Sequence, residues 1–235
     1  MGTVENLPPG GRRAQIIEVA AGLFADRGFD GVSMNDVGAA AGISGAAIYK
    51  HFSGKQQLLG EMLVGISETL LGEGTARVLK ARGFEVGPGR AGHPEHPAGV
   101  GVVPLGTGED DPAGASAAVR GLEVDEAADV LRVLVAWHVE FALDTPALIT
   151  LQFRDLARLV DDDRHRVRRL QRAYVEMWVA VIERAVGADT KHARSAAHAV
   201  FGLINSTPHS ARLDRNEMAA LLERMALAAL HAALG

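Results

Sequence analysis

The sequence predicts an all-α protein of about nine helices, in which a small N-terminal group of three helices precedes a larger helical domain. Apolar residues recur at helical spacing through most of the 235 residues, and 48% of the chain is hydrophobic. No segment alternates apolar and polar residues as a half-buried strand does. Glycine, serine and aspartate at the expected helix ends delimit the individual helices.

The first two helices are delimited by their capping residues. The first has an apolar face at helical spacing and is expected to end at Gly28, a favoured residue just past a helix C-terminus. Ser33 and Asp36 have the spacing of a capping box, in which each side chain accepts a backbone N–H of the other residue. A second, short helix is therefore expected over residues 34–41.

A glycine turn leads into the third helix. Gly42 breaks the second helix, and Ser44 is expected to cap a third helix of two turns that ends near Phe52. Two short helices joined by a tight turn after an amphipathic helix form a helix-turn-helix, which lays its second helix in the major groove of DNA.

The third helix combines small and polar residues in a way that suits contact with DNA. Gly45, Ala46 and Ala47 permit close approach to base edges, while Ile48 and Phe52 are expected to turn into the core. Side chains able to reach phosphates or bases follow, namely Tyr49, Lys50 and His51, with Lys55 at the start of the next helix. An ordinary solvated helix face is the alternative interpretation of so short a run.

Residues 13–58 resemble the DNA-binding domain of the TetR family of bacterial transcriptional regulators. The segments IIEVAAGLFADRGFDGVSMNDVGAAAGIS and AAIYKHFSGKQQL carry the resemblance. It implies a helix-turn-helix domain over residues 11–58 and a C-terminal helical ligand-binding and dimerisation domain over residues 59–235. It also implies a homodimer, formed through the last two helices, that binds a palindromic operator in double-stranded DNA. Gly45 departs from the family, in which a larger and often basic residue is common at this position.

The resemblance also implies which residues contact DNA. Arg12 and Arg13 would form an N-terminal arm, and Ser33 would offer its hydroxyl or the N–H groups of its helix start to a phosphate. With few base-reading side chains, alanine contacts to thymine methyl groups and DNA deformability are expected to supply much of the specificity. The full expected set is Arg12, Arg13, Ser33, Ser44, Gly45, Ala46, Ala47, Tyr49, Lys50, His51 and Lys55.

Aromatic and polar side chains on otherwise apolar helix faces are candidates for a ligand pocket in residues 59–235. Core packing or helix capping explains each of them as well. Arg168 and Arg172, on an arginine-rich helix, either form a solvated face or pair with an anionic group of a ligand. The candidates are Trp137, His138, Phe141, Phe153, Arg154, Arg168, Arg172, Tyr174, Met177, Trp178, Asn205 and His209.

Two segments, HVEFALDTPALITLQFRDL and FGLINSTPH, are similar to the branch of the family that senses acyl-CoA thioesters. The expected effector is therefore a small, largely apolar molecule, either an acyl-CoA or another large apolar compound. The family implies a repressor that this ligand releases from DNA. A ligand-insensitive DNA-binding protein or a transcriptional activator is the alternative.

The last two predicted helices carry wide faces of small and apolar residues. A second copy of the chain could cover these faces in a four-helix bundle, and packing within the chain is the alternative. The residues are Ala196, Ala199, Val200, Leu203, Leu222, Met225, Ala226 and Ala229.

Residues 82–120 interrupt the helical pattern and predict a mobile loop, longer than the family usually carries there. They hold nine of the 27 glycines and five of the nine prolines. The G-x-G-x-x-G match at residues 87–92 lacks a preceding strand and a following helix, so we attribute it to chance. His93 and His96 fit a solvated loop better than a metal site, and no metal or cofactor is predicted.

Composition and motifs disfavour several other classes of protein. No apolar run approaches the roughly 20 residues of a membrane span, and no signal-peptide pattern opens the chain, so a cytoplasmic protein without a membrane partner is expected. The absence of cysteine excludes disulfides. The net charge is −5, with five basic and four acidic residues in residues 12–58, so DNA contact depends on a few placed cations. An enzyme is disfavoured because no catalytic or P-loop motif occurs.

Overall fold

All regular secondary structure in the described residues is helical, which confirms the predicted all-α class of about nine helices. The structure is a computed structural model that describes residues 9–84, 115 and 118–232. In chain order its helices are α1 (Pro9–Arg27), α2 (Met34–Ala40), α3 (Gly45–Ile48), α4 (Lys55–Ala81), α6 (Val124–Asp144), α7 (Pro146–Asp155), the 3-10 helix η1 (Leu156–Arg158), α8 (Asp161–Val186), α9 (Thr190–Ile204), α10 (Thr207–Ser210) and α11 (Arg215–Ala232).

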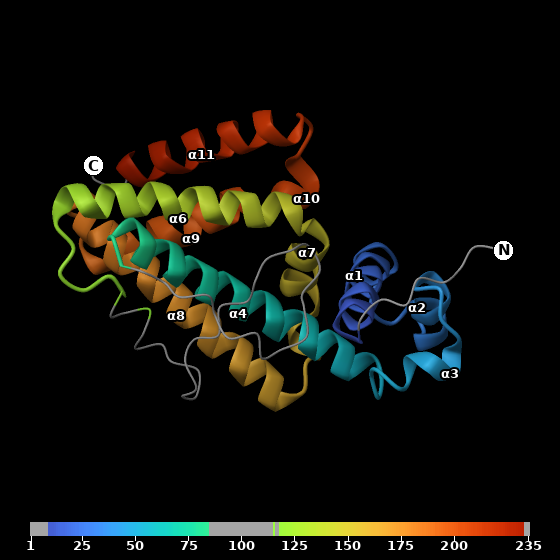
Figure 1. Cartoon of the computed structure of the whole chain (residues 1–235). Coiled ribbons are helices and arrows are strands. Elements are labelled where there is room, and N and C mark those ends of the chain that lie inside the picture. The colour runs from blue at the N-terminus through green and yellow to red at the C-terminus, as the bar shows by residue number, and fades with distance from the viewer. Residues whose placement is uncertain (1–8, 85–114, 116–117, 233–235) are drawn as a thin grey trace.

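The helices form two groups joined by α4 and α7. Figure 1 shows α1, α2 and α3 at one end of the molecule and α6, α8, α9 and α11 at the other. The long helix α4 runs from α3 into the larger group, where it packs against α6 and α8. Helix α7 lies between the two groups and packs against α1. A structural change in the larger group can therefore reach the smaller one through α4 or through α7.

The N-terminal group closes around side chains from each of its helices. Phe24, Val37 and Ile48, one from each helix, are completely buried. Gly28 has a φ of 78°, which confirms the predicted end of α1, and the ring of Phe29 just beyond it packs edge-on against Phe24 at 5.3 Å. The first turn after α1 is therefore fixed by the same core.

Helix α3 has only four residues, which is shorter than the predicted two turns. After Ile48 the backbone continues through i→i+3 hydrogen bonds, from Lys50 N–H to the Ala47 carbonyl oxygen (3.1 Å) and from His51 N–H to the Ile48 carbonyl oxygen (2.9 Å). Such bonds tighten the last turn of a helix. The second predicted turn therefore exists as a tighter coil and not as α-helix.

Helix α8 is the centre of the larger group, where it packs against α4, α6 and α9. Trp178 in its middle is completely buried. Gly74 lets α4 approach α8 closely, because a Cβ at this position would lie 2.9 Å from Cε2 of Tyr174 and 3.2 Å from Cε of Met177. Close packing at Gly74 therefore sets the distance between the two helices.

The last two long helices, α9 and α11, pack against each other and share their apolar residues between core and surface. Four residues of the predicted dimer face, Ala196, Val200, Leu222 and Ala226, are buried within the chain. The other four are half-buried or exposed, namely Ala199, Leu203, Met225 and Ala229. Packing within the chain thus accounts for four of the eight residues, and a second copy of the chain could still cover the other four.

Most of the predicted loop at residues 82–120 lies outside the described residues, as do His93, His96 and the match at residues 87–92. Its C-terminal end differs from the prediction, since Ala118 and Val119 are buried. Arg82 donates to the Ala118 carbonyl oxygen at 2.7 Å and pairs with Glu126 at 2.8 Å. The prediction missed this short apolar run because glycine and proline dominate residues 82–120 as a whole. The run packs onto the larger group.

No single helix among those described is long and apolar enough to cross a membrane. One bent pair, α6 with residues 146–158, meets the length and apolarity of a span only when the two are taken together, at an angle of 89°.

Candidate functional site

The helix-turn-helix consists of α2, α3 and the turn between them. Gly42 in this turn has a φ of 69°, a conformation that favours glycine. Gly38 faces the turn, where a Cβ would lie 3.3 Å from the carbonyl oxygen of Ile43. Ser44 then caps α3 by accepting the backbone N–H of Ala47 at 3.2 Å. The two helices are thus held in close contact, which fixes the orientation of α3.

The predicted contact residues on α3 and in the turn after it are accessible, whereas the two apolar residues that hold this segment in place are buried. Ile48 and Phe52 are buried, as expected from the sequence. Tyr49 is 56% exposed although it is a large aromatic residue. The remaining predicted contacts are exposed or half-buried, namely Ser44, Gly45, Ala46, Ala47, Lys50 and His51. One side of this short segment therefore carries accessible small and polar groups, and its opposite side is buried in the core.

Ser33 is committed to the cap of α2. Its hydroxyl donates to Oδ2 of Asp36 (2.5 Å) and accepts the Asp36 backbone N–H (3.1 Å), which confirms the capping box. The hydrogen bonds from the Ser33 side chain and backbone lower the pKa of the exposed Asp36 carboxyl. A phosphate at Ser33 would therefore meet the negative charge of Asp36, which disfavours the predicted contact there.

Arg12 and Arg13 lie inside α1, so the predicted N-terminal arm at these residues is wrong. Arg12 Nη1 donates to the carbonyl oxygen of Ala41 at 3.3 Å. Arg13 pairs with Glu61 of α4, and its guanidinium lies 4.2 Å from the centre of the Phe52 ring. Because α1 starts at a proline, which is favoured at the first helical position, the helix includes both arginines.

Lys55 is also used within the protein. Its ammonium group donates to the carbonyl oxygen of Phe29 at 2.8 Å and lies 4.6 Å from the centre of that ring. These contacts join the start of α4 to the residues that follow α1. Lys55 is therefore not the free cation that the sequence predicts for a phosphate contact.

Arg154, a predicted ligand contact, faces α1 instead of a pocket. Its guanidinium donates to the carbonyl oxygens of Phe24 and Ala25 in the last turn of α1, the second at 3.0 Å. It also pairs with Asp155 at 2.9 Å. A cation at a helix C-terminus is favourable because it meets unpaired carbonyl groups and the negative end of the helix dipole.

A second arginine extends this contact. Asp155 is only 1% exposed and also pairs with Arg158 at 3.0 Å. Arg158 in turn pairs with Asp30, just beyond α1, at 2.8 Å. We call Arg154, Asp155 and Arg158 the α7–α1 clamp. The buried carboxylate aligns the two arginines, and the arginines attach the larger helical group to the end of α1.

Five side chains from α6, α8, α9 and the residue after α9 form an aromatic and polar cluster, which we call the aromatic–polar core: His138, Tyr174, Trp178, Phe201 and Asn205. The first three are buried, and Phe201 and Asn205 are half-buried. Nδ1 of His138 lies 3.3 Å from the Tyr174 hydroxyl and Nε2 lies 3.1 Å from Oδ1 of Asn205. This geometry fits a neutral imidazole that donates to Asn205 and accepts from Tyr174. The ring of Phe201 lies 4.9 Å from both His138 and Trp178.

Burial controls the charge state of the aromatic–polar core. It lowers the pKa of His138 to about 4, against a smaller opposing effect of the Asn205 hydrogen bond. It raises the pKa of Tyr174, so both groups are neutral at pH 7. Within the described residues, the buried indole N–H of Trp178 makes no hydrogen bond of normal geometry, and its polar neighbour is the Tyr174 hydroxyl, whose pKa it lowers against the larger effect of burial. An unpaired buried donor is costly, and an acceptor on a ligand would remove that cost.

Three further predicted ligand residues lie on the α4 side of the same helices. Trp137 stacks under the guanidinium of Arg77 at 4.0 Å and lies 5.7 Å from the ring of Phe141. Met177 accepts a long hydrogen bond from the Thr75 hydroxyl at 3.8 Å. These residues fill the space between α4, α6 and α8 with adaptable and aromatic side chains.

The other predicted ligand residues do not belong to this core. Phe153 is 69% exposed, and Arg168, Arg172 and His209 are exposed as well. Arg168 and Arg172 are four residues apart on the side of α8 that points away from buried Val167. Their exposure agrees with the alternative of a solvated arginine face, and a role as ligand contacts stays a prediction.

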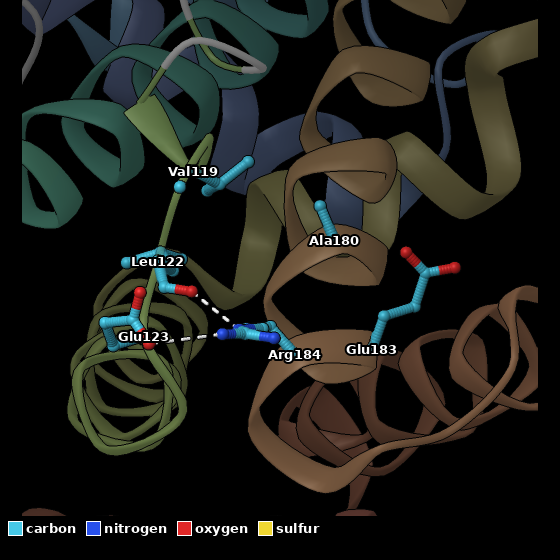
Figure 2. Close-up of a pocket in the computed structure, with 7 residues that line it drawn as sticks. Val119, Leu122, Glu123, Ala180, Glu183 and Arg184 are labelled. Atoms are coloured by element: carbon cyan, nitrogen blue, oxygen red, sulfur yellow. Dashed lines mark hydrogen bonds and ion pairs between the residues drawn. The ribbon is translucent and has the colours of Figure 1, made fainter.

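Two surface hollows exist elsewhere, and neither is lined by a predicted ligand residue. One, of about 450 Å³, lies between α8 and the segment before α6, where Arg184 donates to the Leu122 carbonyl oxygen at 2.6 Å (Figure 2). Ala180 and Glu183 of the same helix also line this hollow. The other, of about 470 Å³, runs along α1, α4 and the start of α8 past Arg13, Gly60 and Asp163.

Two family models match the chain, and together they cover both helical groups. The model described as "Bacterial regulatory proteins, tetR family" matches residues 16–62. The model described as "Tetracyclin repressor-like, C-terminal domain" matches residues 124–230. The chain belongs to the TetR family. These two matches confirm the TetR resemblance seen in the sequence. The family and the relatives below are transcriptional regulators and not enzymes.

Individual relatives agree with this assignment. The transcriptional repressor KstR2 of Rhodococcus jostii is 38% identical over 63 residues, which are 27% of this chain and 31% of that protein. The structure of the ketosteroid transcriptional regulator KstR2 of Mycobacterium tuberculosis has a TM-score of 0.63 at 17% identity, covering 98% of this chain and 96% of that one. The structure of AibR with isovaleryl coenzyme A and operator DNA has a TM-score of 0.55 at 16% identity, covering 91% and 97%. The structural likenesses show a shared fold.

Sequence reasoning missed several residues of the site. Phe201 and the α7–α1 clamp residues Asp155 and Arg158 were not predicted, nor was Arg77. The sequence does contain a signal for Phe201, because it lies four residues before the predicted ligand residue Asn205. Residues at this spacing share one face of a helix, as Tyr174 and Trp178 do. No sequence spacing indicates the contacts of the clamp with α1, since Ala25 and Asp30 lie more than a hundred residues away along the chain.

We predict that the stability of this TetR-family protein falls as the pH falls from 7 to 5, in part because of His138. Its folded-state pKa of about 4 lies below the ordinary value of 6.5 for histidine. As the pH falls, the unfolded chain therefore takes up a proton before the folded chain does, and the stabilising effect of the neutral form is lost. The contribution is about 2 kcal/mol over this range. His138→Phe should flatten the pH dependence in urea titrations at pH 7 and 5, whereas His165→Phe on the exposed side of α8 should not. An unchanged slope in His138→Phe would contradict a buried neutral histidine.

Proposed function

We propose that the protein is a ligand-responsive transcriptional repressor of the bacterial cytoplasm. It binds a palindromic operator as a homodimer and leaves the DNA when a small, largely apolar ligand binds. The observation that carries this proposal is the accessible segment of α3 and its turn, in which Tyr49 and Lys50 border Gly45 and Ala46 while Ile48 is buried behind them. The name of KstR2 as a repressor supports the direction of regulation.

We assign DNA binding to residues 11–58, and ligand binding and dimerisation to residues 59–235. The family models that match residues 16–62 and 124–230 support this division. Helix α4 starts in the first part and ends among the helices of the second.

The proposed DNA contact depends on the close approach of small and polar side chains to the DNA more than on the positive charge of the protein. The Tyr49 hydroxyl and the Lys50 ammonium group would bind phosphate oxygens, and the methyl group of Ala46 would contact thymine methyl groups. Arg13 and Lys55 are held by Glu61 and Phe29, so they contribute less than the sequence predicts. DNA deformability therefore carries part of the specificity in this proposal.

The aromatic–polar core is the proposed ligand site. An apolar ligand would displace aromatic side chains there, and a carbonyl oxygen on it would accept the unpaired N–H of Trp178. An acyl-CoA thioester has both an apolar chain and such a carbonyl group. AibR, whose structure contains isovaleryl coenzyme A and operator DNA, and the ketosteroid regulator KstR2 support an apolar acyl or polycyclic ligand class.

Two connections would carry the response to α3. Helix α4 packs against α8 at Gly74 beside Tyr174, so a ligand that moves the Tyr174 ring also moves α4. The α7–α1 clamp ties the end of α1 to α7. A ligand that binds one arrangement of these helices more tightly shifts the protein toward it and changes the DNA affinity.

DNA binding is tested with the promoter region that flanks the gene for this protein. In gel-shift assays at stated salt, the double variant Tyr49→Ala, Lys50→Ala should bind at least tenfold more weakly than the wild type, because two phosphate contacts are lost. The dependence of affinity on salt should also weaken, by about one unit of log–log slope per half-site for the lost lysine.

Lys80→Ala is the matched control, since it removes an exposed cation at the far end of α4. Equal losses in both variants would mean that α3 has no special role. Acyl-CoA thioesters of increasing chain length, added to the wild-type complex with free coenzyme A as control, test the ligand. Tight binding without release of the DNA would overturn the proposed response.

Dimerisation is assigned to the exposed sides of α9 and α11. Met225 is 45% exposed, and Ala228 and Ala229 beside it are exposed small residues. Ala199 and Gly202 of α9 are exposed as well. A small, partly apolar surface of two helices fits a four-helix bundle with a second copy.

Met225→Asp is expected to convert dimers into monomers in sedimentation experiments, because a carboxylate would be buried without a partner at the interface. Operator affinity should fall with it, since one half-site would be lost. Val124→Asp, which changes an equally exposed residue at the start of α6, is the control and should remain dimeric. A dimeric Met225→Asp variant would place the interface elsewhere.

A further inference from the structure

Gly45, at the start of α3, lies directly under a side chain of α2. A Cβ at Gly45 would lie 2.4 Å from Oδ1 of Asn35, which is closer than real side chains approach, and 3.3 Å from its Cγ, which is a tight contact. The Asn35 amide therefore occupies the space into which a side chain at Gly45 would extend.

The crossing of α2 and α3 explains this arrangement. Gly38, three residues after Asn35 and on the same side of α2, also faces α3. A Cβ there would lie 3.6 Å from the Ser44 carbonyl oxygen and 3.8 Å from Cα of Gly45. One edge of α2, from Asn35 to Gly38, is thus in contact with the first residues of α3.

The amide of Asn35 is not needed to hold this structure together. Asn35 is exposed, and its side chain has no hydrogen-bond partner within residues 9–84, 115 and 118–232. The cap of α2 is formed by Ser33 and Asp36. Asparagine is also a poor helix former compared with alanine. An exposed carboxamide with free donors and a free acceptor is therefore kept beside the small residues Gly45 and Ala46.

We propose that Asn35 reads the operator in place of the side chain that Gly45 lacks, an inference that rests on the proposed DNA-binding function. Gly45 and Ala46 leave room for a base edge to approach, and the amide stands at the border of that space. A carboxamide can donate to N7 and accept from the N6 amino group of adenine, which distinguishes adenine from other bases in the major groove. Specificity at one base pair of each half-site then depends on α2 as well as on α3.

The test starts with wild-type protein and a library of random double-stranded DNA, from which bound sequences are selected. Each base pair of the selected operator is then replaced in turn, and affinities are measured for wild type, Asn35→Ala and Asn216→Ala. Asn35→Ala should lose about ten- to a hundredfold of discrimination at a single base pair of each half-site and little elsewhere. Asn216→Ala makes the same change at an exposed position of α11 and should match the wild type.

Gly45→Ala provides a second, independent measurement. Its methyl group should displace the Asn35 amide and lower discrimination at the same base pair, whereas in an Asn35→Ala background it should have little further effect. Unchanged discrimination in Asn35→Ala, with wild type binding specifically, would overturn this inference alone. Failure of the wild type to select any sequence would overturn the proposed function and this inference with it.

Discussion

The packing of α4 at both of its ends is the constraint on which the rest of the structure depends. Leu58 and Leu59 are buried in the N-terminal group, whereas Val78 is buried among the helices of the larger group. Glycines in a helix interior each cost about 1 kcal/mol relative to alanine, and α4 contains buried Gly60 and Gly74 among others. Tertiary contacts therefore keep α4 helical, and a change in those contacts at one end acts on the whole helix.

Several cations in the described residues join helices to one another. Arg13 joins α1 to α4, Lys55 joins α4 to the turn after α1, and the α7–α1 clamp joins α7 to α1. Such part-buried pairs fix the orientation of the helix-turn-helix more than they add stability. The proposed DNA-binding surface therefore has few free charges, and the proposed contacts depend on close approach at Gly45 and Ala46 and on the polar groups of Tyr49 and Asn35.

The aromatic–polar core contains polar groups where apolar ones would pack as well. His138 is neutral, Tyr174 and Asn205 satisfy its two nitrogen atoms, and the indole N–H of Trp178 makes no hydrogen bond of normal geometry in the described residues. A core with one unpaired donor is less stable than a fully satisfied one. In the proposed response such a core would rearrange around a ligand at lower cost, and Gly74 brings α4 close to the ring of Tyr174, which would take part in that rearrangement.

The sequence by itself determined the helical class, the end of α1, the start of α2 and the helix-turn-helix, because capping residues and apolar periodicity act over only a few residues. The capping box of Ser33 and the turn at Gly42 follow from such local rules. It also nominated His138, Tyr174 and Trp178 as polar or aromatic residues on apolar faces. Only the tertiary structure decided that Arg13, Lys55 and Arg154 contact protein, and that Asn35 lies over Gly45. These contacts join segments brought together by folding, and no local spacing encodes which partner a long cationic or amide side chain will meet.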